Sequence, residues 1–216
     1  MPSISAENYL KNIYELGATE EKVTTSLLAE RLHIAPASVT GMIKKLSREG
    51  FLKHIPYKGV EVTERGKKSA LRTIRKHRLW EMFLVEVLHF SWDAIHGEAE
   101  EFEHIMSDKF EEKIDEVLGF PKVDPHGAPI PAKDGTIKKM YLIPLAAAKE
   151  GATVHVLSIK DEDPELLQYA SSIGIALNKR ILIRQKNKFD DSIVIKVGSR
   201  DTVVSSKLSQ NIFVEA

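Results

Sequence analysis

Residues 24–50 read TTSLLAERLHIAPASVTGMIKKLSREG, with apolar residues three and four positions apart in two segments, 25–32 and 37–49. This spacing predicts two helices, each with one buried face. The short segment 33–36 joins them, and Pro36 suits the first turn of the second helix because its fixed φ is already helical. Two helices joined so closely predict a helix-turn-helix.

The flanking residues extend this unit. Apolar positions over 4–16 predict a preceding helix, and alternating runs at 51–55 and 60–63 predict a β-hairpin after it. Three helices and a hairpin are typical of a winged helix-turn-helix, whose last helix faces base edges while basic side chains contact phosphates. The alternative is a tri-helical module that binds protein. The residues predicted to contact DNA are Pro36, Ala37, Ser38, Thr40, Gly41, Lys44, Lys45, Arg48 and Lys58.

The composition of the 216-residue chain excludes several classes of protein. It has no cysteine, which excludes disulfide scaffolds, iron–sulfur clusters and thiolate zinc sites, so any metal must have nitrogen and oxygen ligands. Basic and acidic side chains number 31 each, but residues 1–76 carry a net charge of +6 and residues 77–150 one of −7. No apolar stretch approaches the length of a membrane span, and the N-terminus lacks signal-peptide features, so we expect a cytoplasmic protein.

The remaining sequence predicts a helical middle region and a β-rich C-terminal region. Helices are expected over 64–90, 92–106 and 108–118, followed by a proline- and glycine-rich linker at 121–135. Beyond it, short β-like runs surround one predicted helix at 164–173 and indicate a compact barrel. The strands are expected at 153–159, 180–185, 192–197 and 202–204.

Six potential metal ligands lie at helical spacing in the middle region. They are His77 and Glu81 on one predicted helix, and His96, Glu100, Glu103 and His104 on the next. On an ideal helix the last four fall within about 100° of arc. The apolar residues around them predict the edge of a core, where buried carboxylates and imidazoles need partners and a divalent cation supplies one. The alternative is an ordinary acidic helix with solvated histidines. No P-loop, H-E-x-x-H or nucleophile-elbow motif is present, and we expect no catalytic residues.

Four segments share a further pattern. They are SVTGMIKKL at 38–46, KHRLWE at 76–81, IHGEAEEFEHIMS at 95–107 and PHGAPIP at 125–131. Together they resemble the diphtheria toxin repressor family, which consists of metal-activated bacterial repressors of iron and manganese uptake. The resemblance covers nearly the whole chain, and residues 38–46 resemble the family's recognition helix.

This resemblance implies a mainly α protein with a small β content and three domains. A winged helix-turn-helix is expected in residues 1–72 and a helical dimerisation and metal-binding domain, with the linker, in residues 73–147. An SH3-like (FeoA-like) β-barrel, which only some members possess, is expected in residues 148–216.

The resemblance also implies two metal sites in each chain. The ancillary site is expected at His77, Glu81, His96 and Asp163, with Asp161, Glu162 and Glu165 as rivals of Asp163. The activating site is expected at Glu100, Glu103, His104, Asn8 and Asp124.

The residue types at these positions bear on the choice of metal. Glu100 stands where iron-type members have cysteine, which favours Mn²⁺, with Fe²⁺ as the alternative and Co²⁺, Ni²⁺, Cd²⁺ or Zn²⁺ as substitutes in vitro. Lys11 stands where the dinuclear site of manganese-type members has glutamate, and it argues against that dinuclear arrangement.

The implied function is that of a homodimeric transcriptional repressor which binds a pseudo-palindromic operator when Mn²⁺ or Fe²⁺ is bound. Its targets would be genes of metal uptake and homeostasis, and we expect no enzyme activity, membrane association or small organic substrate. Because ligating histidines must be neutral, activation should weaken below about pH 6.5. The alternatives are a winged-helix regulator with another effector and a metal-dependent enzyme.

Overall fold

The computed structural model describes residues 2–20, 22–55, 59–161 and 163–215. They form two compact units. Unit 1 contains the residues up to His77 together with 102–108 and 131–137, and unit 2 contains 78–101, 109–130 and the residues from 138 onward. Within the described ranges, no helix is both long and apolar enough to cross a membrane.

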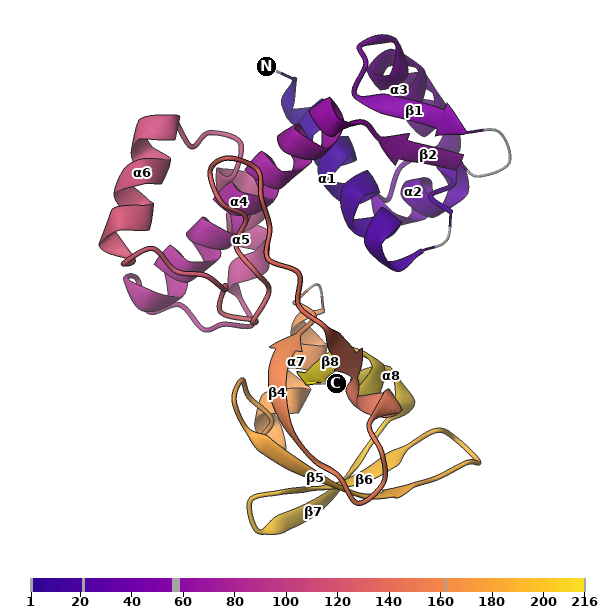
Figure 1. The fold of residues 1–216 in the computed structure, drawn as a ribbon, viewed down its shortest axis with the longest axis vertical. Coiled ribbons are helices and arrows are strands. Elements are labelled where there is room, and N and C mark those ends of the chain that lie inside the picture. The colour runs from indigo at the N-terminus through magenta and orange to yellow at the C-terminus, as the bar shows by residue number, and fades with distance from the viewer. Residues whose placement is uncertain (1, 21, 56–58, 162, 216) are drawn as a thin grey trace. The chain divides into compact units, whose positions relative to one another are not determined.

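Unit 1 contains the predicted winged helix-turn-helix (Figure 1). Ser3 caps the first helix by accepting from the Ala6 N–H, and Thr24 caps the second by accepting from the Leu27 N–H. Pro36 occupies the first turn of the third helix, as expected. The elements are α1 (Ile4–Thr19), α2 (Thr25–Arg31), α3 (Pro36–Arg48), β1 (Leu52–Ile55) and β2 (Gly59–Val62).

One apolar core holds these elements together. Its fully buried members include Leu10 of α1, Leu28 of α2 and Leu46 of α3. The strands β1 and β2 pair antiparallel, with Leu52 opposite Val62. Three helices therefore present one face each to a common core, and the outer face of α3 remains exposed.

Two predicted helices are shorter than expected. The long helix α4 is Glu64–Glu86, because His89 adopts a left-handed conformation (φ 58°) and the Phe90 N–H turns back to the Leu84 carbonyl. The next helix, α5, is Ile95–Phe102, and residues 103–105 form a turn. Placing Glu103 and His104 on the same helix as His96 was therefore wrong.

Unit 2 ends in a six-stranded antiparallel sheet of order β3-β8-β4-β5-β6-β7 (Figure 1). Register shifts interrupt the pairing of β4 with β8 and of β5 with β6, and such bulges bend a sheet. The four predicted strands and the helix at 164–173 are confirmed, whereas β3, β8 and α8 were missed. The elements are α6 (Asp108–Val117), β3 (Leu142–Pro144), the 3₁₀ turn η1 (Leu145–Ala147), β4 (Thr153–Ile159), α7 (Pro164–Ser172), β5 (Arg180–Lys186), β6 (Ile193–Val197), β7 (Arg200–Val204), α8 (Ser206–Gln210) and β8 (Ile212–Glu215).

Candidate metal centre and DNA-binding surface

The outer face of α3 is available to a large partner. Val39, Ile43 and Leu46 anchor the helix in the core of unit 1. A side chain at Gly41 would meet nothing within 4 Å, so this position is open. All predicted DNA contacts on α3 are exposed, whereas Lys58 lies outside the described residues. An exposed basic helix beside a wing is the geometry with which such units enter the major groove.

Glu103 is the centre of a buried polar cluster in unit 1. Its side chain is fully buried, and its Oε2 lies 2.8 Å from Lys11 Nζ and 2.6 Å from His77 Nδ1. The other oxygen, Oε1, lies 3.2 Å from His104 Nε2. Lys11 comes from α1, His77 from α4 and His104 from the turn after α5. The cluster thus joins three segments that are distant in sequence.

His104 is oriented by a carboxylate. Its Nδ1 lies 2.8 Å from Glu7 Oε2, and a carboxylate accepts hydrogen bonds, so Nδ1 carries the proton in neutral His104. The lone pair of Nε2 then faces Glu103 Oε1. Among the described residues, neither of these two atoms has a hydrogen-bond partner, and nor does the buried Asn8 Oδ1. Buried acceptors without donors fit a bound cation, and histidines that bind metals commonly donate their second ring N–H to a carboxylate.

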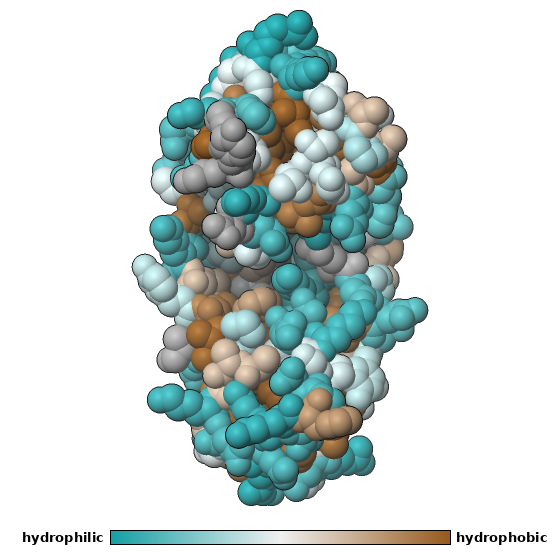
Figure 2. Space-filling model, turned by 90° about the vertical axis from the view of Figure 1, so that its right-hand side faces the viewer, coloured by the Kyte–Doolittle hydropathy of each residue, from teal (hydrophilic) through white to brown (hydrophobic). Residues whose placement is uncertain are grey.

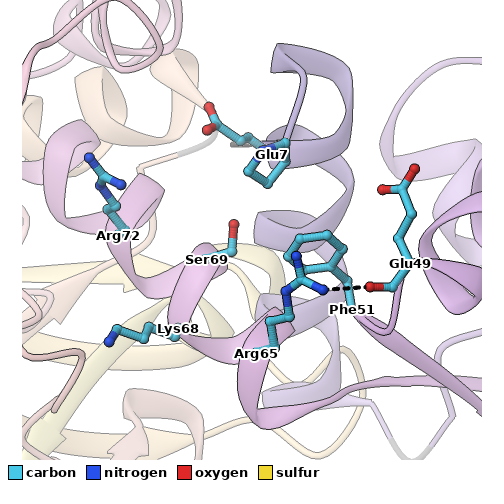
Figure 3. A pocket seen from close by; sticks show the side chains of 8 residues that line it. Glu7, Glu49, Phe51, Arg65, Lys68, Ser69 and Arg72 are labelled. Atoms are coloured by element: carbon cyan, nitrogen blue, oxygen red, sulfur yellow. Dashed lines mark hydrogen bonds between the residues drawn. The ribbon is translucent and has the colours of Figure 1, made fainter.

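A cavity of about 570 Å³ borders this region of unit 1 (Figure 3). Figure 3 shows Glu7 from α1 together with Arg65, Lys68, Ser69 and Arg72 along α4. The cavity is a poor metal site, because the cationic side chains of Arg65, Lys68 and Arg72 line it. Because Glu7 lines this cavity, the group that orients His104 is in contact with solvent.

A second cluster lies within unit 2 around Glu81, whose side chain is fully buried. His96 Nδ1 lies 3.5 Å from Glu81 Oε1 and 3.6 Å from Asp161 Oδ2. Burial lowers the pKa of His96, but the Asp161 and Glu81 carboxylates outweigh burial and raise the pKa to about 10. Glu100 Oε1 approaches the other ring nitrogen at 3.7 Å. His77 precedes Glu81 by one turn of α4 and shares its helix face.

His126 belongs to the same cluster. Its Nε2 lies 2.8 Å from the Trp92 carbonyl, which can only accept, so Nε2 carries a proton. The buried Nδ1 lies 3.7 Å from Asp161 Oδ2 and 3.9 Å from Glu81 Oε1, without a hydrogen-bond partner among the described residues. His126 was not among the predicted ligands, although it lies in the PHGAPIP segment.

Asp124 contacts the loop that carries His126. Its Oδ1 accepts from the His126 N–H at 2.8 Å and the Ala128 N–H at 2.9 Å, and its Oδ2 lies 3.3 Å from Arg78 Nε. Burial raises the pKa of Asp124 to about 7, with the Glu81 carboxylate adding to the rise and the Arg78 guanidinium opposing it. Donor atoms of Glu81, Asp124 and His126 lie within 4.8 Å of one another. The structure therefore places Asp124 beside Glu81, whereas it was predicted in the activating site.

Asp163, the ligand expected from the C-terminal domain, has other partners. Its Oδ1 caps α7 by accepting from the Leu166 N–H, and its Oδ2 lies 2.7 Å from Lys207 Nζ. The Lys207 ammonium and the Leu166 N–H hold the pKa of Asp163 below its usual value. Asp161, named as a rival, is the residue that the structure brings to His96. Of the other rivals, Glu162 lies outside the described residues and Glu165 is exposed.

The chain combines a winged helix-turn-helix with two clusters of buried oxygen and nitrogen donor atoms. This combination defines a class of protein, the metal-responsive DNA-binding regulators. The chain belongs to the iron-dependent repressor family. Residues 1–60 match its N-terminal DNA binding domain, residues 63–132 its metal binding and dimerisation domain, and residues 143–216 the FeoA domain. The expected mainly α fold with an SH3-like C-terminal domain is confirmed.

Individual relatives agree with this assignment. The iron-dependent repressor IdeR of Mycobacterium bovis is 29% identical over 230 residues, which cover 98% of this chain and 96% of that protein. A solved manganese-dependent transcriptional repressor in complex with manganese is 38% identical, with a TM-score of 0.91 over 98% of this chain and 99% of that one. ScaR with bound Zn²⁺ is 34% identical, with a TM-score of 0.87 over 99% of both chains. This chain is accordingly a metal-dependent transcriptional repressor.

Proposed function

We propose that this repressor is activated by Mn²⁺ or Fe²⁺, binds a pseudo-palindromic operator as a homodimer and controls genes of metal uptake and homeostasis. The observation that carries the proposal is the pair of acceptors His104 Nε2 and Glu103 Oε1. They face each other at 3.2 Å in a buried place, without a hydrogen-bond partner among the described residues. A divalent cation is the partner that such a pair lacks.

The proposed ligands form two sites. The activating site in unit 1 uses Asn8, Glu103 and His104, and Glu100 is retained from the sequence prediction. The second site uses Glu81, His96 and Asp161, with His77 retained from the sequence prediction, and Asp161 replaces Asp163 as its C-terminal ligand. Asp124 and His126, which lie beside Glu81, add two donors to this second site.

The choice of metal rests on ligand chemistry. All proposed ligands offer oxygen or imidazole nitrogen, a set that suits Mn²⁺ and Fe²⁺ better than soft ions. One structural relative was solved with manganese, and ScaR was solved with Zn²⁺ and with Cd²⁺. Zn²⁺, Cd²⁺, Co²⁺ and Ni²⁺ would therefore substitute in vitro, and metal availability would select the ion in the cell.

The proposed mechanism is a shift of population. Asn8 lies on α1 of the DNA-binding elements, whereas Glu103 and His104 lie in the turn after α5. Asn8, Glu103 and His104 would hold the ion together, and this would fix α1 relative to that turn. If these three residues hold the ion better in the DNA-binding arrangement than in any other, ion binding would shift the population toward that arrangement. Glu7 supports the ion by holding the proton on His104 Nδ1.

The proposed dimer rests on apolar surface in unit 2. Large apolar areas on a monomer's surface mark interaction sites. Figure 2 views the molecule from the side opposite to α6, so the brown, apolar areas that it draws do not include the side chains named below. Two recognition helices about 34 Å apart would then meet successive major grooves. The exposed apolar side chains in the helical part of unit 2 are Val87, Leu88, Phe90, Phe110, Val117, Phe120 and Val123.

The test is a pull-down of genomic fragments from the source organism with chelator-stripped protein, with EDTA in one tube and Mn²⁺ in the other. We expect a few promoters to be enriched only with Mn²⁺. Equal enrichment in both tubes would mean that the effector is not a metal. Enrichment in neither would contradict DNA binding and favour the enzyme or protein-binding alternatives.

A further inference from the structure

Lys11 places a positive charge inside the polar cluster of unit 1. It is only 4% exposed, and its Nζ lies 2.8 Å from Glu103 Oε2 and 3.1 Å from His77 Nδ1. Asn8 lies three residues earlier on α1, so both side chains project from one face of this helix. The helix therefore brings an ammonium group and a proposed metal ligand to the same cluster.

The two oxygens of Glu103 have different surroundings. Oε2 contacts Lys11 and His77, whereas Oε1 faces His104 Nε2 and has no hydrogen-bond partner in the described part of the chain. A metal ion at Oε1 would share this one carboxylate with the ammonium at Oε2. Two cations that share one buried anion repel each other strongly, because little water screens them.

The same ammonium has a role when no metal is bound. Glu103 is fully buried, and a buried carboxylate without a cationic partner is strongly destabilising. Lys11 supplies that partner in the metal-free chain. Lys11 thus stabilises the metal-free chain and opposes the arrival of a divalent ion.

We propose that Lys11 is a resident cation that sets the metal affinity of the activating site, and with it the metal concentration at which the repressor responds. This inference rests on the proposed function, because the ion that Lys11 opposes is the proposed activator. Removal of the charge should have two opposite effects, a less stable metal-free chain and tighter metal binding. A residue that merely orients Glu103 would produce weaker metal binding when it is removed.

The experiment compares two forms of the 216-residue chain, one with Lys11→Met and one with Lys11 unchanged. Methionine has a similar length and no charge. Both proteins carry His126→Gln, which weakens the site in unit 2 and leaves the unit 1 site as the main one. Thermal unfolding in EDTA measures the metal-free stability, and electron paramagnetic resonance of unbound Mn²⁺ measures the dissociation constant. Lys22→Met is the matched control, because it removes the same charge from an exposed position of unit 1.

We expect Lys11→Met to lower the melting temperature in EDTA by about 5 °C or more. It should tighten Mn²⁺ binding by roughly tenfold or more. Lys22→Met should change neither value. Should Lys11→Met not fold in EDTA, Lys11→Gln, which is neutral and can donate to Glu103, is titrated instead.

Unchanged or weaker Mn²⁺ binding in the Lys11 variant would overturn this inference while the proposed function stands. A failure of the proposed function has a different signature. In that case Glu103→Gln would leave Mn²⁺ binding unchanged in the chain that keeps Lys11, and both proposals would be overturned.

Discussion

Metal binding at the unit 2 site should release protons at neutral pH. The carboxylates of Asp161 and Glu81 raise the pKa of His96 to about 10, and burial raises the pKa of Asp124 to about 7. At pH 7 the metal-free chain therefore holds a full proton on His96 and about half a proton on Asp124. A metal ion needs both groups deprotonated, so each ion should displace about 1.5 protons. The apparent binding constant should then rise about thirtyfold from pH 6.5 to pH 7.5.

The assay is calorimetric titration of Mn²⁺ in two buffers that differ in ionisation enthalpy, with Glu103→Gln present so that the unit 2 site dominates. The difference in observed enthalpy gives the number of protons released. An ordinary histidine with a pKa of about 6.5 would release only about a quarter of a proton at pH 7. Release of about half a proton or less would mean that His96 does not ligate the ion, because Asp124 alone accounts for that half.

The same clusters and the exposed face of α3 predict a pH dependence of stability and the effects of two substitutions, Glu7→Gln and Lys44→Gln. The raised pKa values of His96 and Asp124 stabilise the folded chain at low pH, and this contribution disappears as the pH rises through the two values. The melting temperature in EDTA should therefore be lower at pH 8.5 than at pH 6. A higher melting temperature at pH 8.5 would contradict the raised pKa values. Glu7→Gln should weaken Mn²⁺ binding in unit 1 about 10- to 100-fold, because His104 no longer has the carboxylate that fixes its tautomer; an unchanged titration would contradict that role. Lys44→Gln should weaken binding to all DNA sequences alike, because Lys44 is predicted to contact phosphates. The slope of the logarithm of the binding constant against the logarithm of salt concentration should become shallower by about 0.9 for each phosphate that Lys44 neutralises. An unchanged slope would mean that Lys44 does not contact DNA.

The winged helix-turn-helix could be predicted because its signals are local. Thr24 and Pro36 mark two helix starts, and the apolar spacing of α3 matches the residues that are buried. The ends of α4 and α5 were harder to predict. The apolar periodicity of α4 continues past Glu86. The local sequence did not predict the left-handed conformation of His89, which ends the helix.

The candidate metal centre was predictable only in part, because a chain that folds back brings distant residues together. Lys11 pairs with Glu103, and His126 approaches Glu81. The members of each pair are too far apart in sequence for helical spacing to predict that they meet. Asp163 is different, since a local signal was present. An aspartate directly before a proline that begins a helix is a typical N-cap, and this role holds the Asp163 carboxylate at α7.

In the proposed mechanism, a divalent ion held by Glu103 controls DNA binding. The most direct test measures the affinity for one Mn²⁺-enriched promoter fragment in EDTA and in Mn²⁺, for Glu103→Gln and for the matched control Glu101→Gln, an exposed position two residues earlier. We predict that the control binds the fragment far more tightly in Mn²⁺ than in EDTA, and that Glu103→Gln binds it equally weakly in both. Full Mn²⁺ dependence in Glu103→Gln would mean that an ion at Glu103 does not control DNA binding.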